Sequence, residues 1–361
     1  MSPKIVIIGS TGKLGEKLIN FLSKKKIKVF GATCYKNLPK LENYKKKIVI
    51  QNIFNLYDNI DKVKFLNFLK KNIDLIYFLD FGSKSLLYLN QLIKFNAYTK
   101  IAIANKEMLI AGGSILRQSI IKSNNELIPL DSEHFSLIHS SINKENINKI
   151  YITASGGPFY FKKNKKLNDI SLNEAINHPK WKMGINNSID SSNFINKLLE
   201  IYELHHIFNI PLYKINFLIS KEAFIHSIIE YKSGILTFNS FKNDMMIPLV
   251  YPLRSYMEVG EIKSFSNIFN DEKLRLFKAF DKRFKIFKYL DFFKGLNHKQ
   301  QIDLMIFNNI AQKKFINKSL KYNNIISFIY KNLFKTKNDT IKLNSFVKII
   351  KYIENFKIYE D

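Results

Sequence analysis

A glycine-rich segment near the start of the 361-residue chain has the residue types and spacing of a phosphate-binding loop. It follows an apolar run, begins an amphipathic stretch and reads Gly9-Ser10-Thr11-Gly12-Lys13-Leu14-Gly15. Glycines permit a tight turn and close approach to a pyrophosphate, and the N-terminus of the following helix offers free N–H groups. The segment therefore predicts a dinucleotide-binding loop, although a strand-to-helix turn of this kind can also be purely structural.

Lys36 lies at the end of the next strand-like segment, where the type of nucleotide is selected. An NAD site places a carboxylate here for the ribose 2′-hydroxyl, but the segment from Val29 to Asn37 contains no Asp or Glu. A lysine at this position favours the 2′-phosphate of NADP. The alternative is that Lys36 is one more surface lysine in a lysine-rich chain.

Three carboxylates predict a site for a hard divalent cation such as Mg²⁺ or Mn²⁺. Asp131 and Glu133 follow an apolar run at 127–130, and Glu200 lies within a predicted helix over 191–207. Two carboxylates at a strand end can converge on one cation, and a third completes an oxygen-rich set of ligands. A surface turn at 131–133 and an ordinary ion pair between Lys197 and Glu200 are the alternatives.

Polar residues around the same helix predict a phosphate pocket. Asp190 and Ser191 occupy the expected N-cap, and Asn196 and Lys197 share a helix face with Glu200. Hydroxyl and backbone N–H groups for a phosphate are also offered by the loop Ser155-Gly156-Gly157-Pro158. A flap that covers a ligand is predicted from His178 and Trp181 in the segment Asn177-His178-Pro179-Lys180-Trp181-Lys182-Met183-Gly184.

The elements that must position these residues change in kind along the chain. Strands are predicted at 4–8, 27–33, 47–51, 73–79 and 99–104, with helices at 13–24, 61–71 and 84–95. This alternation predicts a mainly parallel sheet. Further strands are predicted at 127–130, 149–154, 215–219, 225–231 and 234–238, and the chain is helical in pattern from about 271.

The fold class is therefore α/β, with three parts. We expect an N-terminal Rossmann-like NADP-binding domain, a central α+β catalytic domain and a C-terminal helical domain. The boundaries are 1–130, then 131–254 with a flap at 177–187, a linker at 255–275, and 276–361.

Composition excludes several classes of protein. The 46% of hydrophobic residues excludes a disordered chain, and one cysteine, Cys34, excludes disulfides within the chain and a cysteine-based metal site. No signal peptide or transmembrane helix is expected. The net charge of +27 would suit a nucleic-acid-binding protein, but only four of 57 basic residues are arginine and the lysines are dispersed. We therefore expect no nucleic-acid partner and no membrane partner.

Together these motifs resemble the 1-deoxy-D-xylulose 5-phosphate reductoisomerase family. The segments that carry the resemblance occur in the family's order. They are Gly9-Ser10-Thr11-Gly12, Ala104-Asn105-Lys106-Glu107, Asp131-Ser132-Glu133-His134, Thr153-Ala154-Ser155-Gly156-Gly157-Pro158-Phe159, His178-Pro179-Lys180-Trp181-Lys182-Met183-Gly184, Ser188-Ile189-Asp190-Ser191, Asn196-Lys197 and Glu200. Tyr35 departs from the pattern, since the family prefers glycine there.

The resemblance implies a role for each matching residue. NADPH would be bound by Gly9, Thr11, Gly12, Lys13, Leu14, Lys36, Asn37, Asn105, Glu107 and Gly184. Mg²⁺ or Mn²⁺ would be ligated by Asp131, Glu133 and Glu200. The substrate would be held by Lys106, Ser132, Glu133, Ser155, His178, Trp181, Ser191, Asn196, Lys197 and Glu200, of which Lys106, Glu133, His178 and Lys197 would be catalytic.

The resemblance also implies the reaction and the setting. The substrate would be a phosphorylated sugar, 1-deoxy-D-xylulose 5-phosphate, which is rearranged by a retro-aldol/aldol route and reduced to 2-C-methyl-D-erythritol 4-phosphate for isoprenoid precursors. A cytoplasmic homodimer is the family's form. The alternatives are another NADP-dependent Rossmann oxidoreductase and, from a different class, a basic nucleic-acid-binding protein.

Overall fold

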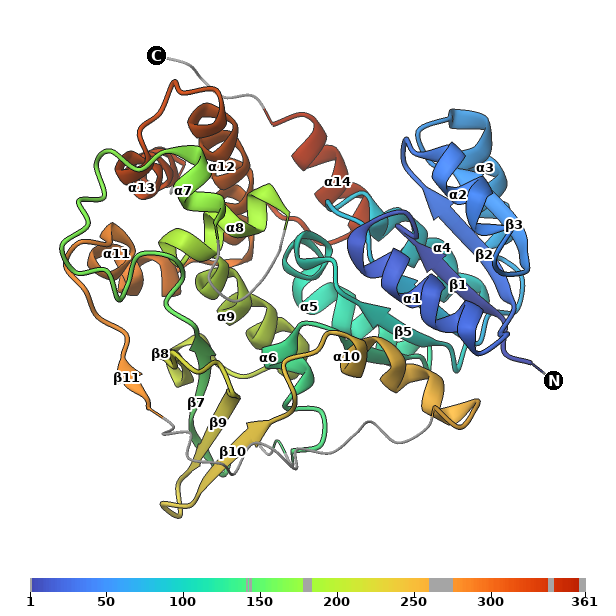
Figure 1. Cartoon of the computed structure of the whole chain (residues 1–361), viewed down its shortest axis with the longest axis horizontal. Helices are drawn as coiled ribbons and strands as arrows, with labels where there is room; N and C mark the ends of the chain where they lie inside the picture. Colours follow the sequence, from blue (N-terminus) through green and yellow to red (C-terminus); the bar gives the residue numbers. More distant parts are fainter. Residues whose placement is uncertain are drawn as a thin grey trace. The chain divides into compact units, whose positions relative to one another are not determined.

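The computed structural model describes residues 2–140, 142, 145–177, 184–259, 275–336 and 341–356. Two compact units make up the chain, and Figure 1 shows their elements. The first unit comprises Met1–Ile138, Lys242–Asn270 and Ser345–Lys351. The second unit comprises His139–Phe241, Asp271–Asn344 and Tyr352–Asp361.

The first unit contains a six-stranded sheet in the order β3-β2-β1-β4-β5-β6. Its strands are β1 (Ile5–Ile8), β2 (Val29–Cys34), β3 (Ile50–Asn55), β4 (Leu75–Phe78), β5 (Lys100–Ile103) and β6 (Glu126–Pro129). Every neighbouring pair is parallel. This confirms the predicted parallel sheet. The carboxyl ends of all six strands therefore lie at one edge of the sheet, where ligands bind in folds of this kind.

Helices follow the strands of the first unit. The predicted helices are α1 (Lys13–Lys24), α3 (Asn59–Phe68) and α4 (Ser85–Phe95). Four more were not predicted: α2 (Leu38–Tyr44), α5 (Lys106–Lys122), α6 (Ser132–Phe135) and α10 (Met246–Val250). The helix α2 begins at the cap Asn37, whose side chain accepts a hydrogen bond from the Lys40 backbone N–H.

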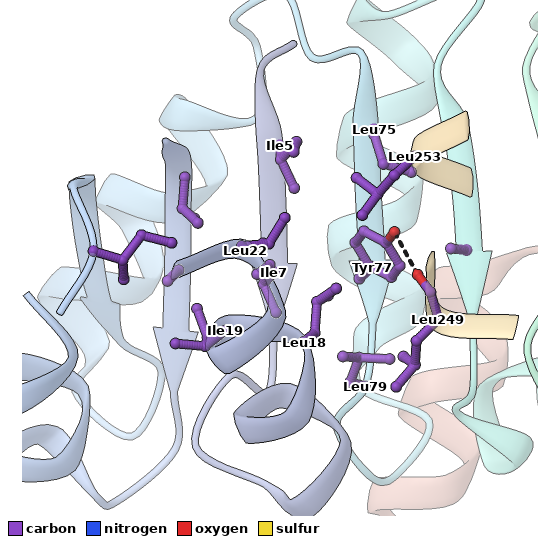
Figure 2. Close-up of a cluster of buried hydrophobic side chains, with 14 of the residues drawn as sticks. Ile5, Ile7, Leu18, Ile19, Leu22, Leu75, Tyr77, Leu79, Leu249 and Leu253 are labelled. Atoms are coloured by element: carbon purple, nitrogen blue, oxygen red, sulfur yellow. Dashed lines mark hydrogen bonds between the residues drawn. The ribbon is translucent and has the colours of Figure 1, made fainter. Parts of the chain in front are cut away.

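Figure 2 shows the core on one face of this sheet. Leu18, Ile19 and Leu22 lie on one side of α1 and pack on Ile5 and Ile7 of β1. Leu249 and Leu253, from a distant part of the sequence, join the same core. The buried Tyr77 hydroxyl donates to the Leu249 carbonyl oxygen at 2.8 Å, which satisfies both polar groups.

The second unit contains a mixed five-stranded sheet in the order β10-β9-β7-β8-β11. Its strands are β7 (Ile147–Ala154), β8 (Ile215–Ile219), β9 (Ile225–Tyr231), β10 (Leu236–Ser240) and β11 (Phe277–Lys278). Only β7 and β8 run parallel, and the other pairs are antiparallel. The predicted α+β character of the central region is confirmed.

Besides α10, the described residues that follow α6 in the sequence form seven α-helices. They are α7 (Leu172–Ile176), α8 (Ile185–Asn193), α9 (Ile195–Phe208), α11 (Lys285–Lys294), α12 (His298–Ile316), α13 (Ile325–Lys335) and α14 (Phe346–Glu354). The predicted helical C-terminal part is confirmed, with the short strand β11 before it. Among the described residues, no helix has the length and apolar character needed to cross a membrane.

The single helix predicted over 191–207 was wrong, because two helices occupy this region. The break is at Phe194, whose φ of 68° lies in the left-handed region. This backbone conformation is unfavourable for a residue with a side chain. Phe194 is nevertheless buried, and its ring contacts those of Tyr160, Phe217, Phe284 and Phe287. This aromatic packing stabilises the break.

Candidate functional site

The glycine-rich loop connects β1 to α1 at the carboxyl edge of the parallel sheet. Gly9 has a φ of +79°, and a Cβ atom there would lie 2.6 Å from the Asp80 backbone nitrogen. A Cβ atom on Gly15 would lie 2.5 Å from the Gly9 carbonyl oxygen. Gly12 caps α1 without a side-chain hydrogen bond, and Lys13 and Leu14 begin the helix. The loop therefore has the tight, backbone-lined form that a pyrophosphate needs.

A lysine from α2 fixes the loop from the side. Lys40 Nζ donates to the Thr11 carbonyl oxygen at 3.1 Å and pairs with Glu16 at 2.9 Å. The hydrogen bond to Glu16 raises the pKa of Lys40, so this amine stays charged. The role of Lys40 could not be predicted from its sequence pattern, because its contacts depend on how α2 packs beside the loop.

Lys36 and Asn37 lie just beyond β2, beside the loop in the order of the sheet. Both side chains are exposed. Lys36 Nζ lies 5.1 Å from the centre of the Tyr57 ring, so a cation–π contact holds it at this edge. Asn37 caps α2, which gives this residue a structural role in addition to the predicted one.

Asn105, Lys106 and Glu107 begin α5 at the carboxyl end of β5. Asn105 is buried, and its side chain is occupied by the protein: Nδ2 donates to Asp80 and to the Gly82 carbonyl oxygen, and Oδ1 accepts from the Met108 N–H. Burial raises the pKa of Asp80 and of Glu107. The hydrogen bond between Asn105 and Asp80 was not predicted from the sequence.

The acidic segment Asp131–His134 follows β6 and forms the start of α6. Asp131 caps α6 by accepting from the Glu133 N–H, and Asp131 and Glu133 each offer a carboxylate oxygen within 4.8 Å of the other. Ser132 donates to Glu133, and the buried His134 ring lies 3.2 Å from Asp131. Two close carboxylates suit a hard divalent cation.

In the second unit, three predicted residues meet on α9. Lys197 Nζ lies 2.5 Å from Glu200 Oε2, and Asn196 Nδ2 donates to Glu200 Oε1. Lys197 and Glu200 are 6% and 2% exposed. The ion pair that was the alternative to a metal site is therefore present. It is also buried, and buried charges are costly unless they are paired.

The loop after β7 also belongs to the second unit. Gly156 and Gly157 have φ values of +88° and +57°, and the Ser155 hydroxyl accepts from the Gly157 N–H at 3.4 Å. A Cβ atom on Gly157 would lie 2.9 Å from the Ser191 carbonyl oxygen. Gly157 thus lets the loop that contains Ser155 approach α8 closely at the Ser191 backbone.

The predicted N-cap role of Asp190 and Ser191 was wrong, because both lie inside α8. Asp190 is buried and accepts from Asn308 Nδ2 at 2.9 Å and from Gln312 Nε2 at 2.5 Å, both on α12. The cap of α8 is Gly184. Asp190 therefore joins α8 to α12 and so positions Ser191. His178 and Trp181 lie outside the described residues.

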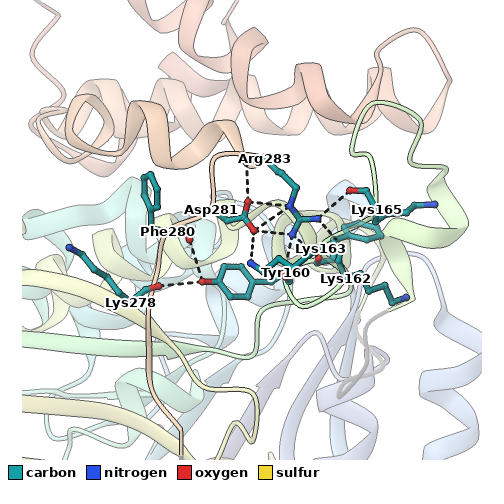
Figure 3. Close-up of polar contacts among 9 residues, drawn as sticks. Tyr160, Lys162, Lys163, Lys165, Lys278, Phe280, Asp281 and Arg283 are labelled. Atoms are coloured by element: carbon teal, nitrogen blue, oxygen red, sulfur yellow. Dashed lines mark hydrogen bonds and ion pairs between the residues drawn. The ribbon is translucent and has the colours of Figure 1, made fainter.

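Figure 3 shows a clamp on the chain that follows the Ser155 loop. The Arg283 guanidinium donates to the carbonyl oxygens of Phe159, Tyr160, Lys162 and Lys165 and pairs with Asp281 at 2.9 Å. Asp281 also pairs with Lys163 at 2.8 Å, and its bonds to Arg283 and Lys163 hold its pKa below the usual range despite burial. Residues 159–165 are thereby held against the segment before α11 that contains Asp281 and Arg283.

Known proteins resemble the chain over nearly its whole length. Residues 127–208 match the family described as 1-deoxy-D-xylulose 5-phosphate reductoisomerase C-terminal domain. The 1-deoxy-D-xylulose 5-phosphate reductoisomerase of Clostridium novyi is 31% identical, over 97% of this chain and 98% of that protein.

Solved structures share the fold. The 1-deoxy-D-xylulose 5-phosphate reductoisomerase from Zymomonas mobilis in complex with NADPH matches 98% of this chain and 97% of that chain, with a TM-score of 0.83 and 22% identity. A DOX-P reductoisomerase in complex with NADPH, fosmidomycin and magnesium matches 98% of this chain and 96% of that chain, with a TM-score of 0.78 and 20% identity.

Proposed function

The chain belongs to the 1-deoxy-D-xylulose 5-phosphate reductoisomerase family, and from this we propose how its residues share the reaction. The reaction converts 1-deoxy-D-xylulose 5-phosphate into 2-C-methyl-D-erythritol 4-phosphate with NADPH and a divalent metal. The observation that carries the assignment of residues is the buried Asn196–Lys197–Glu200 group. Charged groups with little exposure are typical of functional sites.

The first unit binds NADPH in this proposal. The cradle formed by Gly9, Gly12 and Gly15 fits a pyrophosphate, since a Cβ atom on Gly9 or Gly15 would collide with the backbone and one on Gly12 would lie only 3.3 Å from the Gly9 carbonyl oxygen. The backbone N–H groups of Lys13 and Leu14 bind it, and Lys36 meets the 2′-phosphate. When bound, NADPH supplies the hydride. Asn105 acts by holding the turn at Gly82 and the start of α5, because its own polar atoms are occupied.

The residues proposed to hold Mg²⁺ or Mn²⁺ are Asp131, Glu133 and Glu200. Their carboxylate oxygens are the donors that these ions prefer. The bound ion supplies Lewis-acid stabilisation of charge on the substrate oxygens. Ser132 donates to Glu133 and thereby orients its carboxylate. The ammonium of Lys197 and the amide of Asn196 perform the same task for Glu200.

Residues around the Ser155 loop and α8 are proposed to bind the sugar phosphate. Ser155, Ser191, Asn196 and Lys197 offer hydroxyl, amide and ammonium donors to phosphate oxygens. Lys106, at the start of α5, adds a positive charge for the substrate. His178 and Trp181 are proposed to cover it as part of the flap at 177–187, which excludes water when it closes.

A direct assay tests the proposed function. The purified chain is mixed with NADPH, 1-deoxy-D-xylulose 5-phosphate and Mg²⁺ or Mn²⁺, and NADPH absorbance and product are followed. We expect consumption of NADPH that requires both the sugar phosphate and the metal, with one 2-C-methyl-D-erythritol 4-phosphate formed per NADPH. NADPH binding without this turnover would instead favour another NADP-dependent oxidoreductase.

The setting of the enzyme follows the family. We propose a homodimer in the cytoplasm that feeds the synthesis of isoprenoid precursors. Light scattering coupled to size-exclusion chromatography tests the dimer, for which the mass would be twice the 42.4 kDa of one chain. A single-chain mass at assay concentrations would contradict it.

A further inference from the structure

An exposed aromatic pair lies beyond the ends of two neighbouring strands of the first unit. Tyr35 follows β2 and Tyr57 follows β3. Their ring centres are 5.4 Å apart, the rings are nearly perpendicular at 87°, and the residues are 61% and 58% exposed. We call Tyr35 and Tyr57 the tyrosine pair. Lys36 lies beside them, with its Nζ 5.1 Å from the Tyr57 ring centre.

The place of the tyrosine pair in the sheet gives it a role. β1, β2 and β3 are adjacent and parallel, so the pair lies at the same edge as the glycine-rich loop. A dinucleotide bound to such a loop places its adenosine ribose at the end of the second strand. Adenine is attached to that ribose, so the base comes within reach of side chains just beyond β2.

The chemistry of the tyrosine pair also suits this base. Exposed aromatic rings stack on nucleobases, because every nucleobase presents a flat π-face. A cation beside these rings is placed to meet a phosphate on the same ribose.

We propose that the tyrosine pair is the adenine-binding surface of the NADPH site, with the base stacked on the face of one ring and in edge contact with the other while Lys36 meets the 2′-phosphate. The inference rests on the proposed function, because it requires NADPH to bind the loop. It goes further in naming two residues that select the adenosine half of the cofactor. Tyr35 stands where the family prefers glycine, so the surface distinguishes this chain.

Binding of cofactor fragments tests the inference without turnover. The affinities of adenosine 2′,5′-bisphosphate and of adenosine 5′-monophosphate are measured by calorimetry for wild type, Tyr35→Leu, Tyr57→Leu and the double variant. We expect the double variant to bind both ligands at least roughly tenfold more weakly and each single variant to lose part of that affinity, because ring contacts with the base do not involve the 2′-phosphate. Tyr57→Phe should keep wild-type affinity, because the phenyl ring still stacks.

A matched control separates stacking from a general effect of losing a surface ring. Tyr98 is 81% exposed and precedes β5 at the opposite edge of the sheet, so Tyr98→Leu should bind both ligands like wild type. All variants are checked for folding by circular dichroism.

Three results would overturn the inference. They are unchanged binding in the double variant, an equal loss in Tyr98→Leu, and a loss confined to the bisphosphate, which would mean that the tyrosines act only by placing Lys36. If wild type turns over NADPH but the double variant binds normally, only this inference fails. If wild type binds neither NADPH nor the fragments, the proposed function fails with it.

Discussion

Glu200 is a buried carboxylate on α9 that contacts two polar side chains. Its two oxygens interact with two side chains of its own helix, one an ammonium and one an amide. Neighbours three and four residues apart on a helix make such contacts possible, and the spacing predicted them. The cost of burying this charge indicates a role beyond helix stability.

Replacing Glu200 with glutamine keeps the shape of the side chain and removes its charge. We expect turnover to fall by at least about 100-fold, because a neutral amide is a poor ligand for a hard cation. Mn²⁺ binding, followed by electron paramagnetic resonance, should weaken in parallel. Circular dichroism should show a folded protein, since a glutamine oxygen can still accept from Lys197.

Glu230→Gln is the matched control for this variant. Glu230 is also a hydrogen-bonded carboxylate of the second unit, where it accepts from the Tyr151 hydroxyl at 3.0 Å. Its replacement should leave Mn²⁺ affinity and turnover unchanged. Wild-type Mn²⁺ affinity in Glu200→Gln would show that the metal assignment is wrong.

Helices and strands could be predicted where a local sequence pattern determines them. They were missed where packing between distant segments determines them. Periodicity located helix α1 and the strands β1, β2 and β4 to β9, because most of each segment is apolar and buried. The strand predicted at 47–51 was misplaced, since β3 runs over Ile50–Asn55 and includes polar residues. Periodicity could not locate the break at Phe194, which depends on rings brought from distant segments. The role of Asp190 was misjudged for the same reason, since its partners lie on α12.

The candidate site divides in the same way. The local groups, namely the glycine-rich loop and the Asn196–Lys197–Glu200 spacing, could be predicted from the sequence. Lys40 and Asp80 could not, because their roles arise from the placement of α2 and of the turn after β4. Arg283 is a further example, since it contacts carbonyl oxygens more than 115 residues away.

The clamp at Arg283 joins two segments of the second unit, so its loss should affect stability more than a surface arginine would. Arg283→Met removes hydrogen bonds to four carbonyl oxygens and leaves Asp281 with less compensating charge. We expect the free energy of unfolding to fall by roughly 2–3 kcal/mol, measured by urea denaturation. Lysine should restore little, because it lacks the planar fork.

The exposed Arg254 provides the comparison. Arg254→Met should change the free energy of unfolding by no more than about 0.5 kcal/mol. If the two methionine variants unfold at the same urea concentration, the clamp contributes nothing to stability.

At the scale of the whole molecule, segments late in the sequence pack against elements formed by segments early in the sequence. Leu249 and Leu253 pack in the core of the first unit, more than 170 residues after Tyr77, to which the Leu249 carbonyl oxygen is bonded. The length of the apolar segments predicts that they are buried, but not which sheet they cover. For this reason the two units each contain residue ranges from separate parts of the chain.

The stability of the molecule at acid pH should depend on one buried histidine. His206 is 6% exposed, lies 2.7 Å from the Gln301 side-chain oxygen, and has the rings of His205 and His298 beside it. Burial, followed by the charges of His298 and His205, lowers the pKa of His206 to about 3. The ring therefore stays neutral in the folded chain under ordinary conditions.

The sign of the effect follows from proton binding. In the unfolded chain this imidazole takes up a proton near pH 6.5, whereas in the folded chain it does so only near pH 3. The stability it contributes is present above about pH 6.5 and is lost as the pH falls toward 3, by up to about 1.4 kcal/mol per pH unit. Denaturation of His206→Gln should therefore show a shallower loss across this window than wild type. Gln301→Leu removes the partner but keeps the imidazole, so it should be less stable yet retain the wild-type slope; equal slopes in wild type and His206→Gln would show that His206 does not carry the acid sensitivity.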